Sequence, residues 1–223
     1  MKILVTSANL GQIDPLGLQH HAQRVPVGTT IELRYHTEDS LPLRVNALHP
    51  RLQAKIPKML SHEMDPGYDY YLWLDSSIFI AHPDAILWML GELGDNEIAL
   101  FRHPHRGSVR AELDFCLEQV NGHNAYLRSR YLNEPMREQV ASYLASGAYV
   151  DDRLFACGIF LYSKSLLGHR PDFLPGWYYE CARWSVQDQL SLPWLLQKHQ
   201  VRHATVRGDI FDNPYFKMVD HHR

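Results

Sequence analysis

Cysteine is scarce in this chain, and its spacing excludes two classes of stabilised fold. The 223 residues contain three cysteines, Cys116, Cys157 and Cys181, and no two of them form a Cys-x-x-Cys pair. This spacing fits neither a zinc ribbon nor a disulfide framework. We therefore expect free thiols in a reducing compartment.

Long apolar runs and an excess of basic residues are also absent. No run of 18 apolar residues exists, and the apolar run at residues 3–5 is too short for a signal peptide. We therefore expect a cytoplasmic protein with no transmembrane segment. The formal net charge is −3 with 14 histidines counted as neutral. A nucleic-acid-binding domain needs a clustered basic excess, so we expect no nucleic-acid partner.

The glycines follow no common phosphate-binding motif. Residues 3–6 are typical of a first buried strand, and a polar, glycine-containing loop follows them, as in many nucleotide-binding α/β domains. This loop fits neither Gly-x-Gly-x-x-Gly nor a P-loop, so the usual dinucleotide and NTPase motifs are absent. Thr6, Asn9 and Asp14 are the candidate contacts of this segment to a base and a ribose. Alternatively, Asp14 only caps the loop.

The remaining composition is that of an ordinary globular protein, 45% hydrophobic and 21% charged. The length fits one α/β domain, which we place at residues 1–223. Further strands are predicted at 29–36, 70–74, 78–80, 97–102, 154–162 and 201–206. Helices are predicted at 51–64, 83–93, 108–121, 125–146, 177–184 and 190–198, and the segment 125–146 is expected to break near residues 133–135, where a proline suits a new first turn. The run 154–162 is the most apolar and predicts a central strand covered on both faces. Gly158 within it indicates close approach by a neighbour or ligand.

Asp75 ends the apolar segment 70–74 and is followed by Ser76 and Ser77 before the next apolar segment. A carboxylate at the end of a buried strand is costly unless it is paired, hydrogen-bonded or bound to a metal. Ligands of open α/β sheets lie at the carboxyl ends of strands, so Asp75 is a candidate site residue. The local alternative is a capped turn in which the serines make short-range hydrogen bonds.

Three cations precede this strand on the predicted helix 51–64. Arg51, Lys55 and Lys58 are spaced by four and three residues, so they share one helix face, although Pro57 interrupts the segment and is expected to begin a second helix. Such a face is usually solvated surface. If it instead lies at the same rim as Asp75, it suits a diphosphate.

Polar side chains also lie at the end of one later predicted strand and near the start of one later predicted helix. His103 and Arg106 follow the predicted strand 97–102, and Asp188 lies near the start of the helix at 190–198. Locally, His103 and Arg106 are explained by an exposed polar loop, and Asp188 by a favourable interaction with the helix dipole. Together with Asp75 they offer carboxylates, imidazoles and cations, which serve one hard divalent metal, a diphosphate and a hydroxylated substrate.

Several pieces of the sequence, in order, carry a resemblance to a known family. They are Lys-Ile-Pro-Lys at 55–58, Tyr-Tyr-Leu-Trp-Leu-Asp-Ser-Ser-Ile at 70–78, His-Pro-His-Arg at 103–106 with Glu112, Leu-Phe-Ala-Cys-Gly-Ile at 154–159 and Trp-Ser-Val-Gln-Asp-Gln-Leu-Ser at 184–191. Over residues 50–195 the chain resembles bacterial members of a glycosyltransferase-like domain family shared with plant mucilage-related transferases, formerly a domain of unknown function. The resemblance implies a single GT-A-like (Rossmann-like) domain, with a mixed sheet flanked by helices.

The same resemblance implies a glycosyltransferase with a nucleotide-sugar donor, UDP-sugar favoured, and a hydroxyl acceptor, a saccharide above all. GT-A enzymes end a strand with Asp-x-Asp, which holds Mn²⁺ or Mg²⁺ against the donor diphosphate. Here that position reads Asp75-Ser76-Ser77, so Asp75 with His221 is the expected metal pair. Arg51, Lys55 and the 75–77 segment are expected around the diphosphate, with or without a metal.

Four further residues are expected to line the donor sugar or the acceptor, namely His103, Arg106, Glu112 and Gln189. In the similar transferases an acidic residue late in the sequence lies near the acceptor, and Asp188 matches its position. In an inverting enzyme it would be the general base, and in a retaining one it would stabilise developing charge.

Two other functions fit the same residues. One is a metal-assisted hydrolase that uses Asp75, His103 and His221, which would require tight metal binding. The other is a non-catalytic carbohydrate- or nucleotide-binding module, since five tryptophans and twelve tyrosines allow stacking on sugars.

Overall fold

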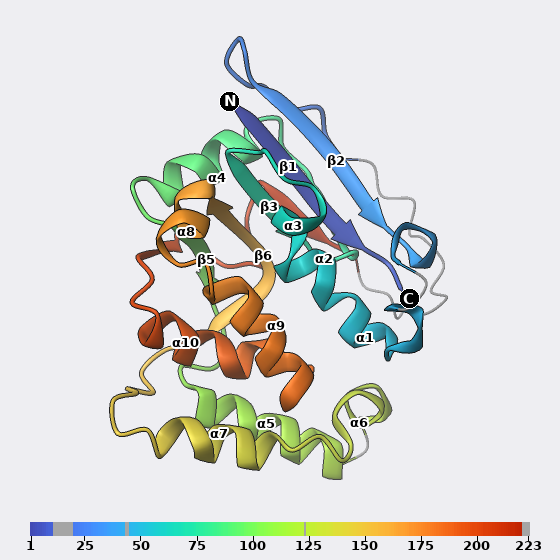
Figure 1. Cartoon of the computed structure of the whole chain (residues 1–223), viewed down its shortest axis with the longest axis vertical. Helices are drawn as coiled ribbons and strands as arrows, with labels where there is room; N and C mark the ends of the chain where they lie inside the picture. The colour runs from blue at the N-terminus through green and yellow to red at the C-terminus, as the bar shows by residue number, and fades with distance from the viewer. Residues whose placement is uncertain (11–19, 43–44, 123, 220–223) are drawn as a thin grey trace.

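The computed structural model describes residues 1–10, 20–42, 45–122 and 124–219 (Figure 1). In that part of the chain a six-stranded sheet has the order β2-β1-β3-β6-β5-β7, and β4 and β8 form a separate ribbon. The strands are β1 (Lys2–Ala8), β2 (Thr30–His36), β3 (Tyr70–Leu74), β4 (Ile78–Ile80), β5 (Ile98–Arg102), β6 (Phe155–Ser163), β7 (His203–Val206) and β8 (Phe216–Met218).

The helices account for most of the remaining described chain. They are η1 (Glu38–Ser40), η2 (Val45–Ala47), α1 (Pro50–Gln53), α2 (Lys55–Met59), α3 (Ser61–Met64), α4 (Ala85–Leu93), α5 (Val109–Asn121), α6 (Ala125–Tyr131), α7 (Met136–Leu144), α8 (Lys164–His169), α9 (Phe173–Arg183) and α10 (Asp188–Lys198). The predicted α/β fold with a mixed sheet flanked by helices is confirmed.

Strand direction decides where the functional edge lies. Strand β1 is parallel to β2 and β3, β5 is parallel to β7, and β6 runs antiparallel to both β3 and β5. The other five strands of the sheet therefore end at one edge, where β6 begins. Residues that follow β1, β3 and β5 meet there, as the position of ligand sites in α/β sheets requires.

Both faces of the sheet are buried, because side chains of each strand alternate between them. In β3, Tyr71 and Trp73 point to one face, where they pack with α2, α9 and α10. Leu72 and Leu74 point to the other face, toward α4 and the β4–β8 ribbon. The predicted central strand, β6, is buried almost throughout and lies between β3 and β5.

A third cluster of apolar side chains joins α5, α6 and α7 to the start of α10, with Val109, Tyr131 and Leu190 among its members. Figure 1 shows these three helices beyond one end of the sheet, beneath α10. They cover the edge at which β5 ends and β6 begins. The cluster therefore brings α6 and the first turn of α10 close to the functional edge.

The structure differs from the predicted elements in several places. The helix at 51–64 is three short helices, broken at Ala54 and Leu60, and Pro57 lies within the first turn of α2 rather than at its start. A proline is tolerated there because first-turn N–H groups have no partner inside the helix. Helix α8 and strand β8 were not expected. Short elements such as these are fixed by contacts with distant strands rather than by local pattern.

Candidate functional site

Asp75 lies immediately after β3, as the sequence predicted. Its backbone N–H donates to the carbonyl of Gly158 on β6 (2.8 Å), and its own carbonyl accepts from Ile78 (2.8 Å), which closes the turn into β4. Its Oδ1 accepts from the indole N–H of Trp73 (2.7 Å) and from the ammonium of Lys58 (3.2 Å). The carboxylate is therefore anchored on one oxygen, while the side chain stays 45% exposed.

Gly158 allows this approach, as predicted. A Cβ atom at that position would lie 3.1 Å from Cδ1 of Ile78 and 3.4 Å from Oδ2 of Asp75. The pairing of β5 with β6 also shifts register here, from Leu100 opposite Phe160 to Phe101 opposite Ala156. The irregular segment of β6 thus makes room for the turn that carries Asp75.

Lys55 and Lys58 are buried rather than solvated. Their relative exposures are 7% and 5%, and both ammonium groups point to Oδ2 of Asp188, at 2.6 and 2.8 Å. Lys58 bridges this carboxylate to that of Asp75. The alternative of a solvated cationic face is therefore wrong for these two residues.

Asp188 is the first residue of α10 and is 4% exposed. Its backbone carbonyl accepts from the indole N–H of Trp177 on α9 (3.1 Å), which fixes the start of the helix. Burial alone would raise the pKa of Asp188, but Lys55 and Lys58 hold it well below its usual range. Burial alone would lower the pKa of Lys58, and the carboxylates of Asp188 and Asp75 raise it above its usual range instead. Asp188 and Lys58 are therefore both charged at neutral pH.

Arg51 does not follow the two lysines, because the helix breaks at Ala54. Its guanidinium donates to the carbonyl (2.6 Å) and hydroxyl (3.1 Å) of Ser129 on α6. The neighbouring Arg130 lies over the ring of Tyr131, 5.5 Å from its centroid. Burial lowers the pKa of Arg51, and the charge of Arg130 lowers it further. The two guanidinium groups thus place like charges near each other at this edge.

A second polar network surrounds Glu112, a buried acid on α5. Arg106 forms an ion pair with it, and the amide of Gln187 donates to its Oε1 (2.6 Å). Gln187 also donates to Oε1 of Gln189 (3.0 Å) and accepts from the hydroxyl of Tyr131 (2.9 Å). The network brings three expected residues, Arg106, Glu112 and Gln189, beside the start of α10.

His103 joins this network from the end of β5. Its Nδ1 accepts from the backbone N–H groups of His105 (3.2 Å) and Arg106 (3.1 Å), and its Nε2 lies 2.9 Å from Nη2 of Arg106. Burial lowers the pKa of His103 to about 4, and the adjacent guanidinium of Arg106 adds to this effect. The imidazole is therefore neutral at pH 7.

Four other residues that were expected to contact the donor lie at this edge of the sheet, and they are buried or half-buried. Thr6 is buried, and its hydroxyl contacts the carbonyl of Leu72 (3.5 Å). Asn9 is buried just past β1, with its backbone N–H bonded to the carbonyl of His36 (2.9 Å). Ser76 and Ser77 are half-buried in the turn after Asp75.

Asp14 and His221 lie outside the described residues, so their expected roles stay predictions. The hydrolase hypothesis also needs His103 beside Asp75. The side chains of those two residues contact different partners, His103 with Arg106, and Asp75 with Lys58 and Trp73. The described part of the hydrolase set is not brought together.

The residues that the structure describes around Asp75 do not fit a divalent cation. Mn²⁺ and Mg²⁺ need several oxygen or imidazole ligands at close range. In the described ranges, no group of three or more His, Cys, Asp or Glu side chains is placed to hold a metal ion. Two serines follow Asp75, and an ammonium group occupies the space between the two carboxylates. The expected metal therefore stays a prediction.

Three residues of this edge, Trp73, Arg130 and Gln187, have no role predicted from the sequence. Lys58 was expected to meet a diphosphate only as part of the cationic face that it shares with Arg51 and Lys55. The alternation of β3 is the signal for Trp73, because residues two apart share a face. No local signal marks Arg130 or Gln187, since tertiary contacts alone bring them here.

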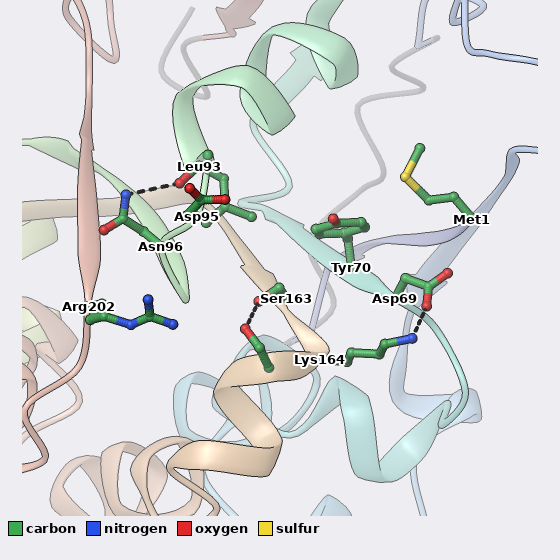
Figure 2. Close-up of a pocket in the computed structure, with 11 residues that line it drawn as sticks. Met1, Asp69, Tyr70, Leu93, Asp95, Asn96, Ser163, Lys164 and Arg202 are labelled. Carbon is green, nitrogen blue, oxygen red and sulfur yellow. Dashed lines mark hydrogen bonds and ion pairs between the residues drawn. The ribbon is translucent and has the colours of Figure 1, made fainter.

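Figure 2 shows a pocket of about 620 Å³ at the opposite edge of the sheet, where β3 begins and β6 ends. Asp69 and Lys164 form an ion pair at its side, and Arg202 reaches in from the segment before β7. None of the expected site residues that the structure describes lines it. We therefore place the candidate site at the Asp75 edge, where the buried charges converge.

No helix within the described ranges has the length and apolar character needed to cross a membrane.

Comparison with known proteins gives a family match over most of the chain. The sequence model of the TOD1/MUCI70, glycosyltransferase-like domain matches residues 45–222. No curated protein matches the chain at a significant level.

Solved structures provide a comparison of fold. Mouse xyloside xylosyltransferase 1 in its apo form is similar with a TM-score of 0.50 and 10% identity, over 92% of this chain and 85% of that chain. The apo structure of the bifunctional glycosyltransferase WbbM has a TM-score of 0.45 and 12% identity, over 78% of this chain and 28% of that chain. The first likeness confirms the expected GT-A-like fold.

Proposed function

The chain belongs to the TOD1/MUCI70 glycosyltransferase-like domain family, and from this premise we propose that it transfers a sugar from a nucleotide-sugar donor to a hydroxyl acceptor. A UDP-sugar is the favoured donor and a saccharide the favoured acceptor. The observation that carries the proposal is the cluster of Lys55, Lys58, Asp75 and Asp188 at the carboxyl ends of the strands. This is the edge at which α/β folds bind their ligands.

The donor diphosphate would lie over this cluster. A diphosphate needs cations that are held in place, since guanidinium groups bind phosphate oxygens in pairs and ammonium groups act as point charges. Arg51 bonds to neutral groups of Ser129 and so keeps its charge for a ligand. Arg130 lies beside it, and its Nε is buried without a hydrogen-bond partner among the described residues.

The base and the ribose would lie at the end of β1, near Asn9 and toward Asp14. Strand β1 is adjacent to β3 in the sheet, so the segment after β1 is next to the turn at Asp75. Thr6 would shape this part of the site from within the sheet. The exposed part of the Asp75 carboxylate would accept hydrogen bonds from hydroxyl groups of the donor sugar nucleotide, and the hydroxyls of Ser76 and Ser77 would donate or accept them.

The donor sugar and the acceptor would meet the network of His103, Arg106, Glu112 and Gln189. This network combines a buried carboxylate, amides and a neutral imidazole, which suit sugar hydroxyls because they offer both donors and acceptors. Gln187 links it to the start of α10. We therefore propose that the acceptor lies between α5 and α10.

Asp188 would act mainly by holding the two lysines. A general base works best when its pKa is near the working pH, whereas two ammonium groups hold the pKa of Asp188 well below its usual range. We propose that it orients Lys55 and Lys58 beneath the diphosphate. The general-base role expected from the resemblance remains the alternative, and it would require both lysines to turn toward the donor.

We also propose a cytoplasmic location. Three buried cysteines that form no disulfide support it, because cytosolic proteins keep their thiols reduced. Cell fractionation with an antibody to the protein tests this part of the proposal.

A ligand panel followed by a transfer assay tests the function. Thermal shift of the purified protein is measured against UDP, GDP, CDP and ADP and their sugar conjugates. A ligand at 100 times its Kd stabilises the folded state by about 2.7 kcal/mol, which moves the melting temperature by a few degrees. We expect one base, uracil first, to give the shift and its sugar conjugate to be consumed with a saccharide acceptor. No shift with any member contradicts the proposal.

A further inference from the structure

The first observation concerns the acid that is missing after β3. Asp75 is followed by Ser76 and Ser77, so the turn supplies one carboxylate. In the described ranges, no set of three His, Cys, Asp or Glu side chains converges on a possible metal position. Among the described residues, a divalent cation would have only Asp75 as a ligand beside the diphosphate itself.

The second observation is the occupant of the space beside Asp75. The ammonium of Lys58 lies 3.2 Å from Oδ1 of Asp75 and 2.8 Å from Oδ2 of Asp188. The same Oδ1 accepts from Trp73 at 2.7 Å, and the Lys58 ammonium lies 5.6 Å from the centroid of the Trp73 ring. A metal ion on this oxygen would displace two hydrogen bonds and would stand beside a buried cation, which repels it.

The third observation is the charge balance. The two carboxylates, Asp75 and Asp188, are matched by the two ammonium groups of Lys55 and Lys58. Arg51 and Arg130 add positive charge at the same edge, and Arg130 interacts with Asp188 electrostatically. Glu134 is the acid that also faces Arg51. The edge therefore favours an anion and offers a divalent cation little attraction.

The geometry points to a donor site that needs no divalent cation, in which the buried Lys58 ammonium supplies the positive charge beside Asp75. This inference rests on the proposed function, because it concerns the diphosphate of the same donor. Lys58 would contact the diphosphate from below, and the exposed side of Asp75 would accept a hydroxyl of the donor. Lys55 and Asp188 would keep the Lys58 ammonium in position.

The test is a binding measurement that does not depend on turnover. Purified protein is treated with EDTA, and the Kd of UDP is measured by calorimetry in excess EDTA, then with Mg²⁺ and with Mn²⁺. GDP, CDP and ADP are measured in the same three buffers. We expect the diphosphate that binds to have the same Kd within about threefold in all three. We also expect electron paramagnetic resonance to show no Mn²⁺ bound to the protein beyond that held by the nucleotide in solution.

Variants of Lys58 provide the second part of the binding test. Lys58→Met is expected to weaken nucleotide binding in EDTA at least tenfold, and Lys58→Arg, which keeps the charge, to weaken it less. Circular dichroism and a melting curve confirm that each variant is folded. If Lys58→Met does not fold, Lys58→Arg and Lys58→Gln are compared. Lys164→Met is the matched control, because Lys164 is an exposed lysine at the opposite edge.

The outcomes separate the inference from the function on which it rests. Nucleotide binding that appears only with Mg²⁺ or Mn²⁺, or one equivalent of Mn²⁺ bound to the protein, overturns the inference and leaves the proposed function standing. Unchanged binding in folded Lys58 variants also overturns it. No binding of any diphosphate in any buffer refutes the proposed function and the inference together.

Discussion

The ammonium group of Lys58 lies 2.8 Å from a carboxylate oxygen of Asp188, and both side chains are buried. The two residues come from α2 and from the first turn of α10, so the fold alone brings them together. A buried ion pair is sensitive to the loss of either partner, because the remaining charge stays buried without compensation. This relationship gives the candidate site its stability as well as its charge.

Removal of the Lys58 charge should therefore destabilise the protein. We expect Lys58→Met to lower the free energy of unfolding by roughly 3–5 kcal/mol, since Asp75 loses its cation and Asp188 keeps one of two. Urea denaturation measures the change. Lys164→Met, which breaks the exposed pair with Asp69, should leave the unfolding curve nearly unchanged. Similar curves for the two variants would show that the buried bridge is not formed in solution.

Replacement of Asp188 should reduce turnover at every pH in the working range. In Asp188→Asn the lysines lose the carboxylate that orients them, and a misplacement of about 1 Å costs about 10²-fold in rate. Because the two ammonium groups keep Asp188 ionised, the ratio of wild-type to variant kcat should be constant from pH 6 to pH 9. Transfer rates measured across this range check the ratio. A wild-type rate that falls on the acidic side, with no such fall in the variant, would identify Asp188 as the general base instead.

Gly158 should tolerate no side chain. In Gly158→Ala the new methyl group would lie 3.1 Å from Ile78, a buried residue, and 3.4 Å from Asp75. Overpacking of this kind costs about 1–3 kcal/mol, and here it also displaces the turn that holds Asp75. Melting curves and nucleotide binding should both be affected. Gly168→Ala on α8 is the control, since nothing lies within 4 Å of its added methyl group. Equal stability of the two variants would argue against the close contact.

His103 should make stability fall at acidic pH. Its pKa in the folded state is about 4, against an ordinary value of 6.5, so the unfolded chain binds a proton first as the pH falls. The contribution of the neutral His103 imidazole to the free energy of unfolding is fully present above pH 6.5. It is lost between pH 6.5 and pH 4, by up to about 3 kcal/mol. His103→Asn should lose less stability than the wild type over this window. Unfolding free energies at pH 7, 5.5 and 4 measure the difference.

The control for this prediction is the exposed neighbour two residues along the chain. His105→Asn should follow the wild-type pH dependence, because its side chain is exposed. If His103→Asn and the wild type lose the same stability between pH 7 and pH 4, the imidazole of His103 is not held in its neutral form.

Much of the framework followed from local pattern. The apolar segment that ends at Asp75 predicted a buried strand with a carboxylate at its end, because a strand covered on both faces must be apolar throughout. Gly158 predicted a close approach, and the structure places Ile78 and Asp75 against it. The order of strands and helices predicted an α/β fold. These features depend on residues near one another in sequence, where periodicity carries the information.

The tertiary structure alone decided what the charged residues do. Spacing placed Arg51, Lys55 and Lys58 on one face, but a break at Ala54 turns Arg51 toward α6 while the two lysines turn inward to Asp188. A cationic face has the same local pattern whether it faces water or a distant carboxylate, since burial depends on which elements pack against it. The sequence by itself therefore determined the strands, the position of Asp75 at the end of a strand, and which charged residues are available to the site. The packing of α2 against α9 and α10 determined that a lysine, and not solvent, fills the space between the two carboxylates.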